Sequence, residues 1–441
     1  MLRKIILRFL TLIAPITIAL LSVILLNNNF TSFSSAFAQG DEFRQREFSD
    51  SGEPELVDRN LKVEEVASGL DTPTTMAFLG PNDILVLEKD KGTVKRILDG
   101  KVLDQPILDV NVANSVERCM CGIAISKHDD TTYVFLYYTE INGSDGEDRQ
   151  GKQPIGNRLY RFELVGNALK NPVLLLDLPA LPGPRHNGGA IVIGPDNNLY
   201  VPIGDVDGSF RGEDFQTLTQ NYRDGIDADG RSGILRVTQD GQPVGEGIIG
   251  NEIPLRLYYA YGIRNSFGLA FDPLTGKLWD TENGPGSSDE INLVEPGFNS
   301  GWQEMTGISR FDEEFDESEL VDFDGKGHYR DPELVWLNTA GPTAVLFMTS
   351  DKLGTQYLNQ MFVADVHNGR IYHFVLTEDR MHLVLPPALQ DRVIRSATAA
   401  GLEQIIFGQE FGGITDLKIG PDGYLYVVSV GLGKIFRIVP S

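Results

Sequence analysis

A unit of two short apolar strands joined by a tight turn recurs along this chain, and this repeat constrains the fold more than any other feature. In each copy, β-branched or aromatic runs alternate with Gly, Pro, Asn or Asp, which favour strands and turns respectively. One such unit cannot bury both of its faces, so neighbouring copies must cover one another. Six copies can be traced, at residues 76–97, 122–162, 191–237, 269–279, 361–372 and 417–438.

Six copies with few helical stretches predict an all-β fold, a six-bladed β-propeller. The alternative for a chain of short strands is a β-sandwich or a barrel. The hydrophobic content of 41% is sufficient for a large core, and we expect the propeller to occupy residues 59–441. Because the copies are unevenly spaced, long loops must be inserted between them, and such loops commonly carry function.

The N-terminal segment is expected to lie outside this fold. Basic residues precede an apolar run over residues 9–26, and an Ala-Phe-Ala tripeptide ends at residue 38. This order is typical of a signal peptide, and the run also reaches the length of a membrane-spanning helix. We therefore expect residues 1–38 to be a signal peptide or an N-terminal membrane anchor, and residues 39–58 to be a flexible lead-in. Either interpretation predicts an extracytoplasmic protein, secreted or anchored to the outer face of the cytoplasmic membrane.

The formal net charge of −24 excludes one class of partner. The phosphates of a nucleic acid would be repelled by so acidic a chain, so nucleic-acid binding is not expected. Bound divalent cations would suit the charge, and a solvated acidic surface is the simpler explanation.

Two cysteines, Cys119 and Cys121, are separated by one residue. A pair this close is expected not to form an easy disulfide, and two thiols are too few for a zinc site. The spacing favours two small apolar side chains in a strand.

A histidine among glycines is the first candidate for chemistry. His186 follows a Pro-Gly-Pro loop and precedes Gly188-Gly189, and an imidazole with a reference pKa of about 6.5 is a suitable general base. Asp205 ends the hairpin that begins at this loop, so its carboxylate could return to the imidazole and fix the tautomer. The alternative is a loop histidine without a role.

Two further clusters carry polar groups. Arg264 and Asn265 are adjacent donors flanked by glycines, suitable for an anionic or carbonyl ligand, or for an arginine that bridges two blades. Residues 282–292 form a Gly/Pro loop with exposed carbonyl oxygens followed by carboxylates. Oxygen-rich groups of this kind suit Ca²⁺, although acidic loops are also common on solvated surfaces.

These clusters, in this order, resemble the soluble pyrroloquinoline quinone (PQQ) dependent aldose sugar dehydrogenases of the glucose/sorbosone dehydrogenase family, over roughly residues 60–440. The resemblance implies a six-bladed propeller that oxidises an aldose to a lactone with PQQ and Ca²⁺ and passes electrons to an external acceptor. It is carried by these motifs: Glu117-Arg118 before Gly122, His186 before Gly188-Gly189, Gly204-Asp205, Arg264-Asn265 before Gly268, Glu282-x-Gly284-Pro285 with Asp289-Glu290, and Gly-Pro-Asp-Gly at 420–423.

The resemblance also implies roles for single residues. His186 resembles the base that takes the proton of the sugar C1 hydroxyl, and Asp205 the carboxylate that orients it. Arg264 resembles the donor that stabilises negative charge on the cofactor, with Asn265 as its neighbour in the cofactor site. Glu117 falls where the family has a polar pocket residue.

The metal ligands follow from the same resemblance. Gly284 and Pro285 resemble the backbone ligands of the Ca²⁺ that polarises the quinone, which would act as a Lewis acid. Glu290 resembles a residue that contributes to a second, structural Ca²⁺.

The chain departs from the family where PQQ carboxylates are held. An Arg-Ile-Arg-Asp motif is replaced by Gly-Ile-Thr-Asp at 413–416, and a lysine is missing from the turn at 367–370. Charge-assisted bonds of this kind are worth roughly 1.5–3 kcal/mol each. Arg370, Arg392 or Arg395 could substitute from another direction.

Three functions are therefore compared. The first is an exported quinoprotein that oxidises aldoses. The second is an extracellular calcium-binding propeller that has lost PQQ and binds carbohydrate or protein without redox chemistry. The third is a Ca²⁺-dependent hydrolase such as a lactonase, which would need several carboxylates at one metal, whereas the sequence offers Glu117 and Asp205.

Overall fold

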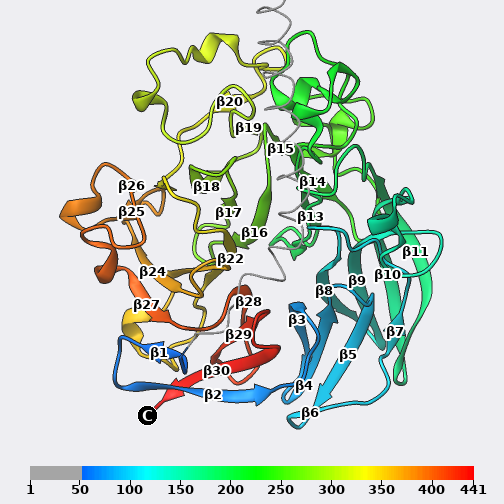
Figure 1. The fold of residues 1–441 in the computed structure, drawn as a ribbon, viewed down its shortest axis with the longest axis vertical. Coiled ribbons are helices and arrows are strands. Elements are labelled where there is room, and N and C mark those ends of the chain that lie inside the picture. Colours follow the sequence, from blue (N-terminus) through cyan, green and yellow to red (C-terminus); the bar gives the residue numbers. More distant parts are fainter. Residues whose placement is uncertain (1–51) are drawn as a thin grey trace, which may run out of the picture. The chain divides into compact units, whose positions relative to one another are not determined.

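The computed structural model describes residues 52–441, and it is a mostly β structure with a propeller-like arrangement of sheets (Figure 1). The predicted leader, residues 1–38, and the lead-in up to residue 51 lie outside the described residues. The described strands form six sheets of four to six strands each. The prediction of an all-β, propeller-like fold is confirmed.

The first two sheets are built from consecutive strands. The first sheet has the order β3-β4-β5-β6, with β7 also paired to β5, and the second has the order β11-β10-β9-β8. Their bounds are β3 (Pro73–Gly80), β4 (Asp83–Glu88), β5 (Thr93–Leu98), β6 (Lys101–Val102), β7 (Leu108–Asp109), β8 (Met120–His128), β9 (Thr131–Glu140), β10 (Gly156–Val165) and β11 (Ala168–Leu178).

The third and fourth sheets each include outer strands that come from later parts of the chain. Their orders are β12-β13-β14-β15-β19-β20 and β16-β17-β18-β21-β26. Their bounds are β12 (Val192–Ile193), β13 (Leu199–Ile203), β14 (Gly233–Val237), β15 (Tyr258–Tyr261), β16 (Ser266–Phe271), β17 (Leu278–Glu282), β18 (Asp289–Val294), β19 (Phe298–Asn299), β20 (His328–Tyr329), β21 (Leu334–Trp336) and β26 (Val393–Ile394).

The last two sheets each take one strand from the beginning of the described chain. The fifth has the order β1-β27-β24-β23-β22, with β25 also paired to β24, and the sixth has the order β2-β30-β29-β28. Their bounds are β1 (Glu55–Leu56), β2 (Leu61–Ala67), β22 (Pro342–Phe347), β23 (Met361–Asp365), β24 (Ile371–Leu376), β25 (Leu383–Val384), β27 (Ile406–Gln409), β28 (Ile414–Ile419), β29 (Leu425–Ser429) and β30 (Lys434–Pro440).

Strand β1 corrects the predicted boundary of the lead-in. Glu55 and Leu56 fall within residues 39–58, yet they pair with Gln409 and Gly408 of β27. Leu56 also packs against the hydrophobic cluster of the fifth and sixth sheets. A two-residue strand lacks a periodic pattern, so the sequence could not reveal it.

Hydrophobic side chains fill the space between each pair of neighbouring sheets. Six clusters link the sheets in cyclic order, from the first and second through to the sixth and first. This arrangement is what the repeat predicts, because each sheet covers the face of its neighbour. The cycle closes where β2 pairs with β30.

The turn of the repeat has a shared chemistry in two of the copies. Asp196 accepts a hydrogen bond from the backbone N of Asn198 at 3.2 Å and another from the Tyr200 hydroxyl at 3.0 Å. Asp422 does the same with the backbone N of Tyr424 and the hydroxyl of Tyr426, at 3.2 and 2.9 Å. An aspartate in the turn therefore fixes both the turn and the strand that follows it.

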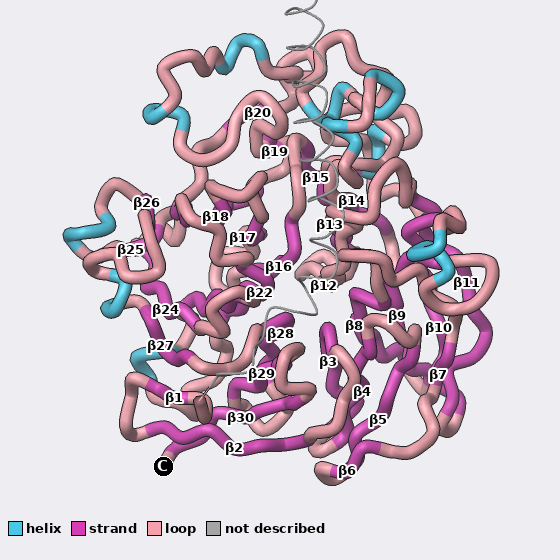
Figure 2. The backbone as a smooth tube through the Cα atoms, viewed as in Figure 1, coloured by secondary structure: helices cyan, strands magenta, loops and turns pink. Residues whose placement is uncertain are grey.

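Helical structure in the described part of the chain is limited to short 3-10 turns, and Figure 2 shows them in the loops. No helix among residues 52–441 is long and apolar enough to cross a membrane. The 3-10 turns are Glu147–Gln150, Gly208–Phe210, Glu213–Phe215, Leu218–Gln220, Leu255–Leu257, Ser309–Phe311, Glu317–Glu319, Thr355–Tyr357, Pro387–Leu389 and Leu402–Gln404.

Candidate active site

A central cavity is lined by the first strands of all six sheets. Residues from β3, β8, β16, β22 and β28 line it, together with residues 190–192 at the start of β12. The predicted site residues Glu117, His186 and Arg264 lie in the segments that lead into β8, β12 and β16. The site therefore assembles at the end of the cavity where these strands begin. The polar lining is Thr74, Thr75, Thr343, Thr415, Asp416 and Lys418.

His186 and Asp205 form a buried pair, as the sequence predicted. Nδ1 of His186 lies 2.5 Å from Oδ1 of Asp205, and the two residues are 2% and 0% exposed. An ionised carboxylate only accepts hydrogen bonds, so this contact assigns the proton to Nδ1. Nε2 makes no hydrogen bond to the residues that the structure describes, and it is left as the basic nitrogen.

The charge state of Asp205 follows from its partners. Burial raises the pKa of this carboxyl, but the charge and hydrogen bond of His186, helped by Arg264 and Ser209, lower it below its ordinary value overall. Asp205 is therefore a carboxylate at neutral pH, as an orienting group for an imidazole must be.

Close approach of two loops explains the glycines after His186. A Cβ on Gly188 would lie 2.2 Å from the carbonyl oxygen of Pro202, and a Cβ on Gly189 would lie 2.7 Å from the Cβ of Cys121. The residues at 188 and 189 must therefore lack side chains for the histidine loop to pack against β13 and β8.

Glu117 links the histidine loop to the second donor cluster. Its Oε2 accepts a hydrogen bond from the backbone N of His186 at 2.7 Å and from Nδ2 of Asn265 at 3.4 Å. Asp205 completes the connection, because its backbone N donates to the carbonyl of Arg264 at 3.0 Å. The structure thus brings together Glu117, His186, Asp205, Arg264 and Asn265.

The Arg264 guanidinium is half-buried beside these residues. Nη1 donates to the carbonyls of Asn283 and Gly284 at 2.6 and 2.7 Å, while Nε has no hydrogen-bond partner among the described residues. Burial lowers the pKa of Arg264, and the nearby charge of Asp205 opposes this effect. The Nε–H is therefore a buried donor that no described residue satisfies.

Trp302 is a site residue that sequence reasoning missed. Its Nε1 donates to Oδ2 of Asp205 and to Oγ of Ser209, both at 3.0 Å. The guanidinium carbon of Arg264 lies 5.3 Å from the centre of its ring. The only signal in the sequence was the Gly301-Trp302 pair, which by itself predicts no contact with Asp205.

Cys119 and Cys121 form a disulfide, so the expectation of two free apolar cysteines was wrong. Their Cα atoms are 5.2 Å apart, closer than the roughly 6.6 Å between alternate residues of a regular strand. The cause is a β-bulge, since the pairing of β8 with β9 shifts register between Met120 and Gly122. Cys121 is the extra residue of this bulge.

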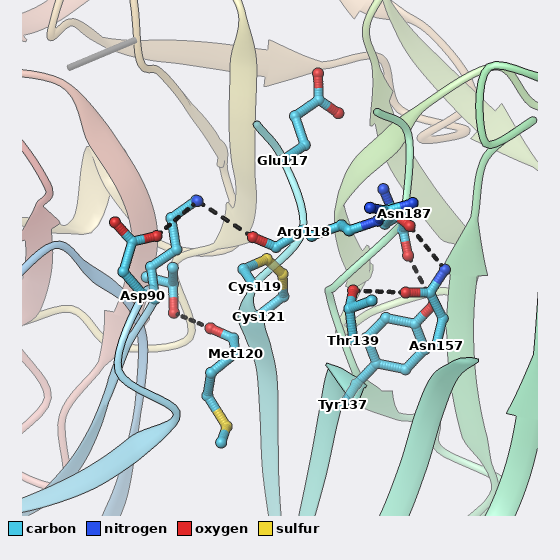
Figure 3. The surroundings of a disulfide bond; sticks show 12 residues. Asp90, Glu117, Arg118, Cys119, Met120, Cys121, Tyr137, Thr139, Asn157 and Asn187 are labelled. Carbon is cyan, nitrogen blue, oxygen red and sulfur yellow. Dashed lines mark hydrogen bonds and ion pairs between the residues drawn. A yellow bond between two sulfur atoms is a disulfide. The ribbon is translucent and has the colours of Figure 1, made fainter. Parts of the chain in front are cut away.

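The disulfide lies directly after the two polar residues that lead into β8 (Figure 3). Arg118 donates to Oδ2 of Asp148 at 3.0 Å and to the carbonyls of Ala180 and Gly183 at 2.8 and 3.3 Å. Arg118 therefore holds the loop that leads to His186, while the disulfide constrains the backbone at residues 119–121.

Two of the predicted metal ligands, Gly284 and Glu290, accept hydrogen bonds from protein donors. The Gly284 carbonyl accepts from Arg264 and from the backbone N of Gly286. The two carboxylate oxygens of Glu290 accept from the backbone N of Gly307 at 2.6 Å and from Nδ2 of Asn292 at 3.2 Å. Within residues 52–441, no three His, Cys, Asp or Glu side chains are grouped so that they could hold a metal ion. Calcium at Gly284, Pro285 and Glu290 stays a prediction.

Three buried carboxyls share one face of β17 and β18. Glu282 lies opposite Glu290 in the strand pairing, and Asp280 is two residues from Glu282. Burial, together with the charge of Glu282, raises the pKa of Asp280 and of Glu290 well above the ordinary value. Burial raises the pKa of Glu282 to about 7, although Ser300 and the backbone N of Arg264 oppose this shift.

The arginines proposed as substitutes for the missing cations contact other parts of the chain. Arg370 donates to the carbonyl of Ala397 at 3.0 Å, and Arg392 to that of Pro332 at 2.9 Å. Arg395 pairs with Asp391. The structure does not bring any of the three into contact with His186 or Arg264.

Comparison with known proteins gives the family. The sequence model described as "Glucose / Sorbosone dehydrogenase" matches residues 70–437. This chain belongs to the glucose/sorbosone dehydrogenase family. The resemblance noted in the sequence is thus confirmed, and the protein is assigned to a family of oxidoreductases.

Individual relatives agree with this assignment. The chain is 26% identical to the structure of a putative oxidoreductase (glucose dehydrogenase) from Thermus thermophilus, with a TM-score of 0.64 and coverage of 86% of this chain and 100% of that one. It is 23% identical to an aldose sugar dehydrogenase of Escherichia coli over 86% of this chain and 93% of the relative. The PQQ-bound aldose sugar dehydrogenase of Streptomyces coelicolor has the same fold, with 24% identity, a TM-score of 0.60 and coverage of 87% and 99%.

Proposed function

We propose that this protein is an exported quinoprotein that oxidises the C1 hydroxyl of aldose sugars to lactones, with PQQ as the hydride acceptor. The family supports dehydrogenase chemistry, and the PQQ-bound Streptomyces relative supports the choice of cofactor. The observation that carries the proposal is the buried His186–Asp205 pair beside the unpaired Nε–H of Arg264.

His186 is the general base of this proposal. Because Asp205 holds the Nδ1 proton, Nε2 has a lone pair that can take the proton of the C1 hydroxyl. As this proton leaves, the C1–O bond becomes the carbonyl of the lactone and the C1 hydrogen departs with its electron pair. PQQ, when bound, supplies the two-electron acceptor for that hydride.

Arg264 is the electrophilic group of this proposal. Its unpaired Nε–H can donate to the negative charge that develops as the hydride is accepted, and such a donor acts strongly there because the Nε atom is shielded from water. Asn265 belongs to the proposed cofactor site, and through Glu117 it is connected to the backbone of His186.

The described residues fit the quinone end of PQQ better than its carboxylate end. At the quinone end, Arg264 offers the unpaired Nε–H as a donor. For the carboxylates, Lys418 is the one lysine or arginine among the described residues that lines the central cavity, and its Nζ lies 3.0 Å from Oδ1 of Asp416. Arg370, proposed from the sequence as a cofactor ligand, would need to leave Ala397 to contribute.

Calcium is part of the proposal at the Gly284 and Pro285 carbonyls. A carbonyl loop of this kind suits a hard cation. The ion would have to replace the contact of Arg264 with Gly284 or share that oxygen with it. The second ion, at Glu290, would likewise compete with Gly307 and Asn292.

The location and the number of blades are also proposals. The basic residues and apolar run of the N-terminal segment support an extracytoplasmic protein, secreted or anchored. We propose that each of the six sheets is one blade of a six-bladed propeller. The cyclic series of hydrophobic clusters supports this count.

Reconstitution tests the function directly. Purified protein is mixed with PQQ and Ca²⁺, cofactor binding is measured by titration, and aldose-dependent dye reduction is followed with an artificial electron acceptor. We expect turnover that is lost in His186→Ala and kept in His128→Ala, whose imidazole is exposed and bonds Ser126 and Gln239. Absence of PQQ binding at micromolar concentration would reject the dehydrogenase proposal.

One observation favours a second function. The missing cations and the engagement of Arg370, Arg392 and Arg395 elsewhere support a calcium-binding propeller that has lost PQQ and binds carbohydrate or protein. In that case a sugar would bind in the absence of PQQ, and His186→Ala would change its affinity without any turnover to lose.

A further inference from the structure

Trp302 contacts both halves of the proposed site. Its indole N–H donates to Asp205, which holds His186, and its ring lies against the guanidinium of Arg264. No other described side chain both donates a hydrogen bond to Asp205 and packs its ring on Arg264. One residue therefore supports the base and the electrophilic group together.

The N–H of Trp302 completes the hydrogen bonding of a fully buried carboxylate. Oδ1 of Asp205 accepts from His186 and from the backbone N of Asp207 at 3.1 Å, while Oδ2 accepts from Trp302. Asp205 is 0% exposed, so water cannot replace a lost donor without entering the site. Without the indole N–H, Oδ2 would lose a donor, and the orientation of Asp205 would depend on the contacts of Oδ1 with His186 and Asp207 and on Ser209.

Trp302 is itself held in place through hydrogen bonds of its own backbone N–H and carbonyl groups. Its N donates to the carbonyl of Gly262 at 3.0 Å, and its carbonyl accepts from Nδ2 of Asn221 at 2.8 Å. The side chain is 4% exposed, and the ring of Phe210 packs on its edge at 5.9 Å. A ring fixed from several sides can orient the groups that it touches.

We propose that Trp302 is a positioning residue, which orients Asp205 through its N–H and Arg264 through the face of its ring. Its effect on turnover rests on the proposed function. Its effect on the His186–Asp205 contact does not, and can be measured in the protein without cofactor.

The first experiment measures the Nδ1–H proton of His186 by NMR in cofactor-free protein. We expect a strongly downfield, slowly exchanging signal in the wild type, and a signal that moves upfield or exchanges at least tenfold faster in Trp302→Phe. Trp336→Phe is the matched control, because that indole is also buried but its N–H has no hydrogen-bond partner in the described part of the chain. An unchanged signal in Trp302→Phe would overturn the proposal.

A second variant avoids any change in packing. The chain has three tryptophans, and the N–H groups of Trp279 and Trp336 have no hydrogen-bond partner among residues 52–441. Replacing all three by the sulfur isostere benzothienylalanine therefore removes one set of indole hydrogen bonds, those of Trp302. This protein should reproduce the NMR change of Trp302→Phe, and a wild-type signal would contradict the role of the N–H.

Kinetics of the reconstituted enzyme separate the effect of the Trp302 N–H on Asp205 from the effect of its ring on Arg264. Trp302→Phe keeps an aromatic face for Arg264 and should lower kcat about tenfold with KM changed less than twofold. Trp302→Leu removes that face as well and should lower kcat further. Equal kcat in Trp302→Phe and the wild type would overturn the positioning role. A wild type without aldose oxidation would reject the proposed function, and the NMR result would still decide the contact.

Discussion

The backbone N of His186 donates to Oε2 of Glu117 at 2.7 Å, although the two residues are 69 positions apart in the sequence. This bond joins the segment before β8 to the loop before β12, and thus two different sheets. A histidine with a positive φ of 59° needs such support, because this backbone conformation is unfavourable for most side chains.

Glu117→Ala should weaken both the fold and the site. Removing the acceptor leaves the buried N–H of His186 unpaired, at a cost of roughly 1–3 kcal/mol in the free energy of unfolding. Chemical denaturation measures this loss, and the turnover of the reconstituted enzyme should fall in parallel. Glu117→Gln keeps an acceptor oxygen and serves as the control. If both variants match the wild type, the bond does not support the loop.

His373 should make the stability depend on pH. Burial against Tyr357 and Phe362 lowers the pKa of this imidazole to about 4. Between this value and the unfolded value of about 6.5, the unfolded chain binds a proton that the folded protein does not. The folded state therefore loses stability as the pH falls through this interval, by about 3 kcal/mol in total.

His373→Phe removes this titration. Denaturation curves at pH 4.5, 5.5 and 7 should show a smaller loss of stability on acidification in the variant than in the wild type. His382→Phe, at a half-exposed imidazole paired with Glu333, is the comparison variant. An equal slope in His373→Phe and the wild type would mean that other groups cause the acid sensitivity.

The disulfide can be tested by counting thiols. Protein denatured without reductant should give no reactive thiol, and two after reduction, since the chain has two cysteines. Cys119→Ser/Cys121→Ser should lower the free energy of unfolding by about 2 kcal/mol at most, because the closed loop is very short. Two thiols before reduction would contradict the disulfide.

Calcium should stabilise the folded protein if it binds where we propose. At a hundredfold excess over its dissociation constant, a ligand of the native state adds about 2.7 kcal/mol to the free energy of unfolding. Thermal melts after chelation and after addition of Ca²⁺ measure this effect. Glu290→Gln should remove the part that belongs to the second ion, whereas an exposed change such as Glu314→Gln should not. No shift in the wild type would reject both ions.

The sequence predicted the parts of the molecule that local patterns encode. The strand–turn units follow from apolar runs and from aspartate turns such as those at Asp196 and Asp422. The propeller-like fold could therefore be predicted from the sequence. The contact between His186 and Asp205 could also be predicted, because the hairpin of β12 and β13 returns the second residue to the first.

Other features depend on contacts that no local pattern records. Trp302 reaches Asp205 across 97 positions, and its side chain resembles any other buried aromatic in the sequence. The disulfide depends on a bulge at Cys121, which a strand pattern treats as regular. The sequence repeat traced at 361–372 did not include β22, which belongs to the same sheet. This strand begins with Pro342 and Thr343, so its apolar run is short.

The pairing of β2 with β30 has a consequence for biosynthesis. The last sheet takes its outer strand from residues 61–67 and its other strands from residues 414–440. During translation, β2 is therefore synthesised long before the strand with which it pairs. Until β30 leaves the ribosome, the backbone groups of β2 have no strand partner and are open to association with other chains. Premature termination before residue 434 should therefore yield an aggregating product rather than a shorter stable ring.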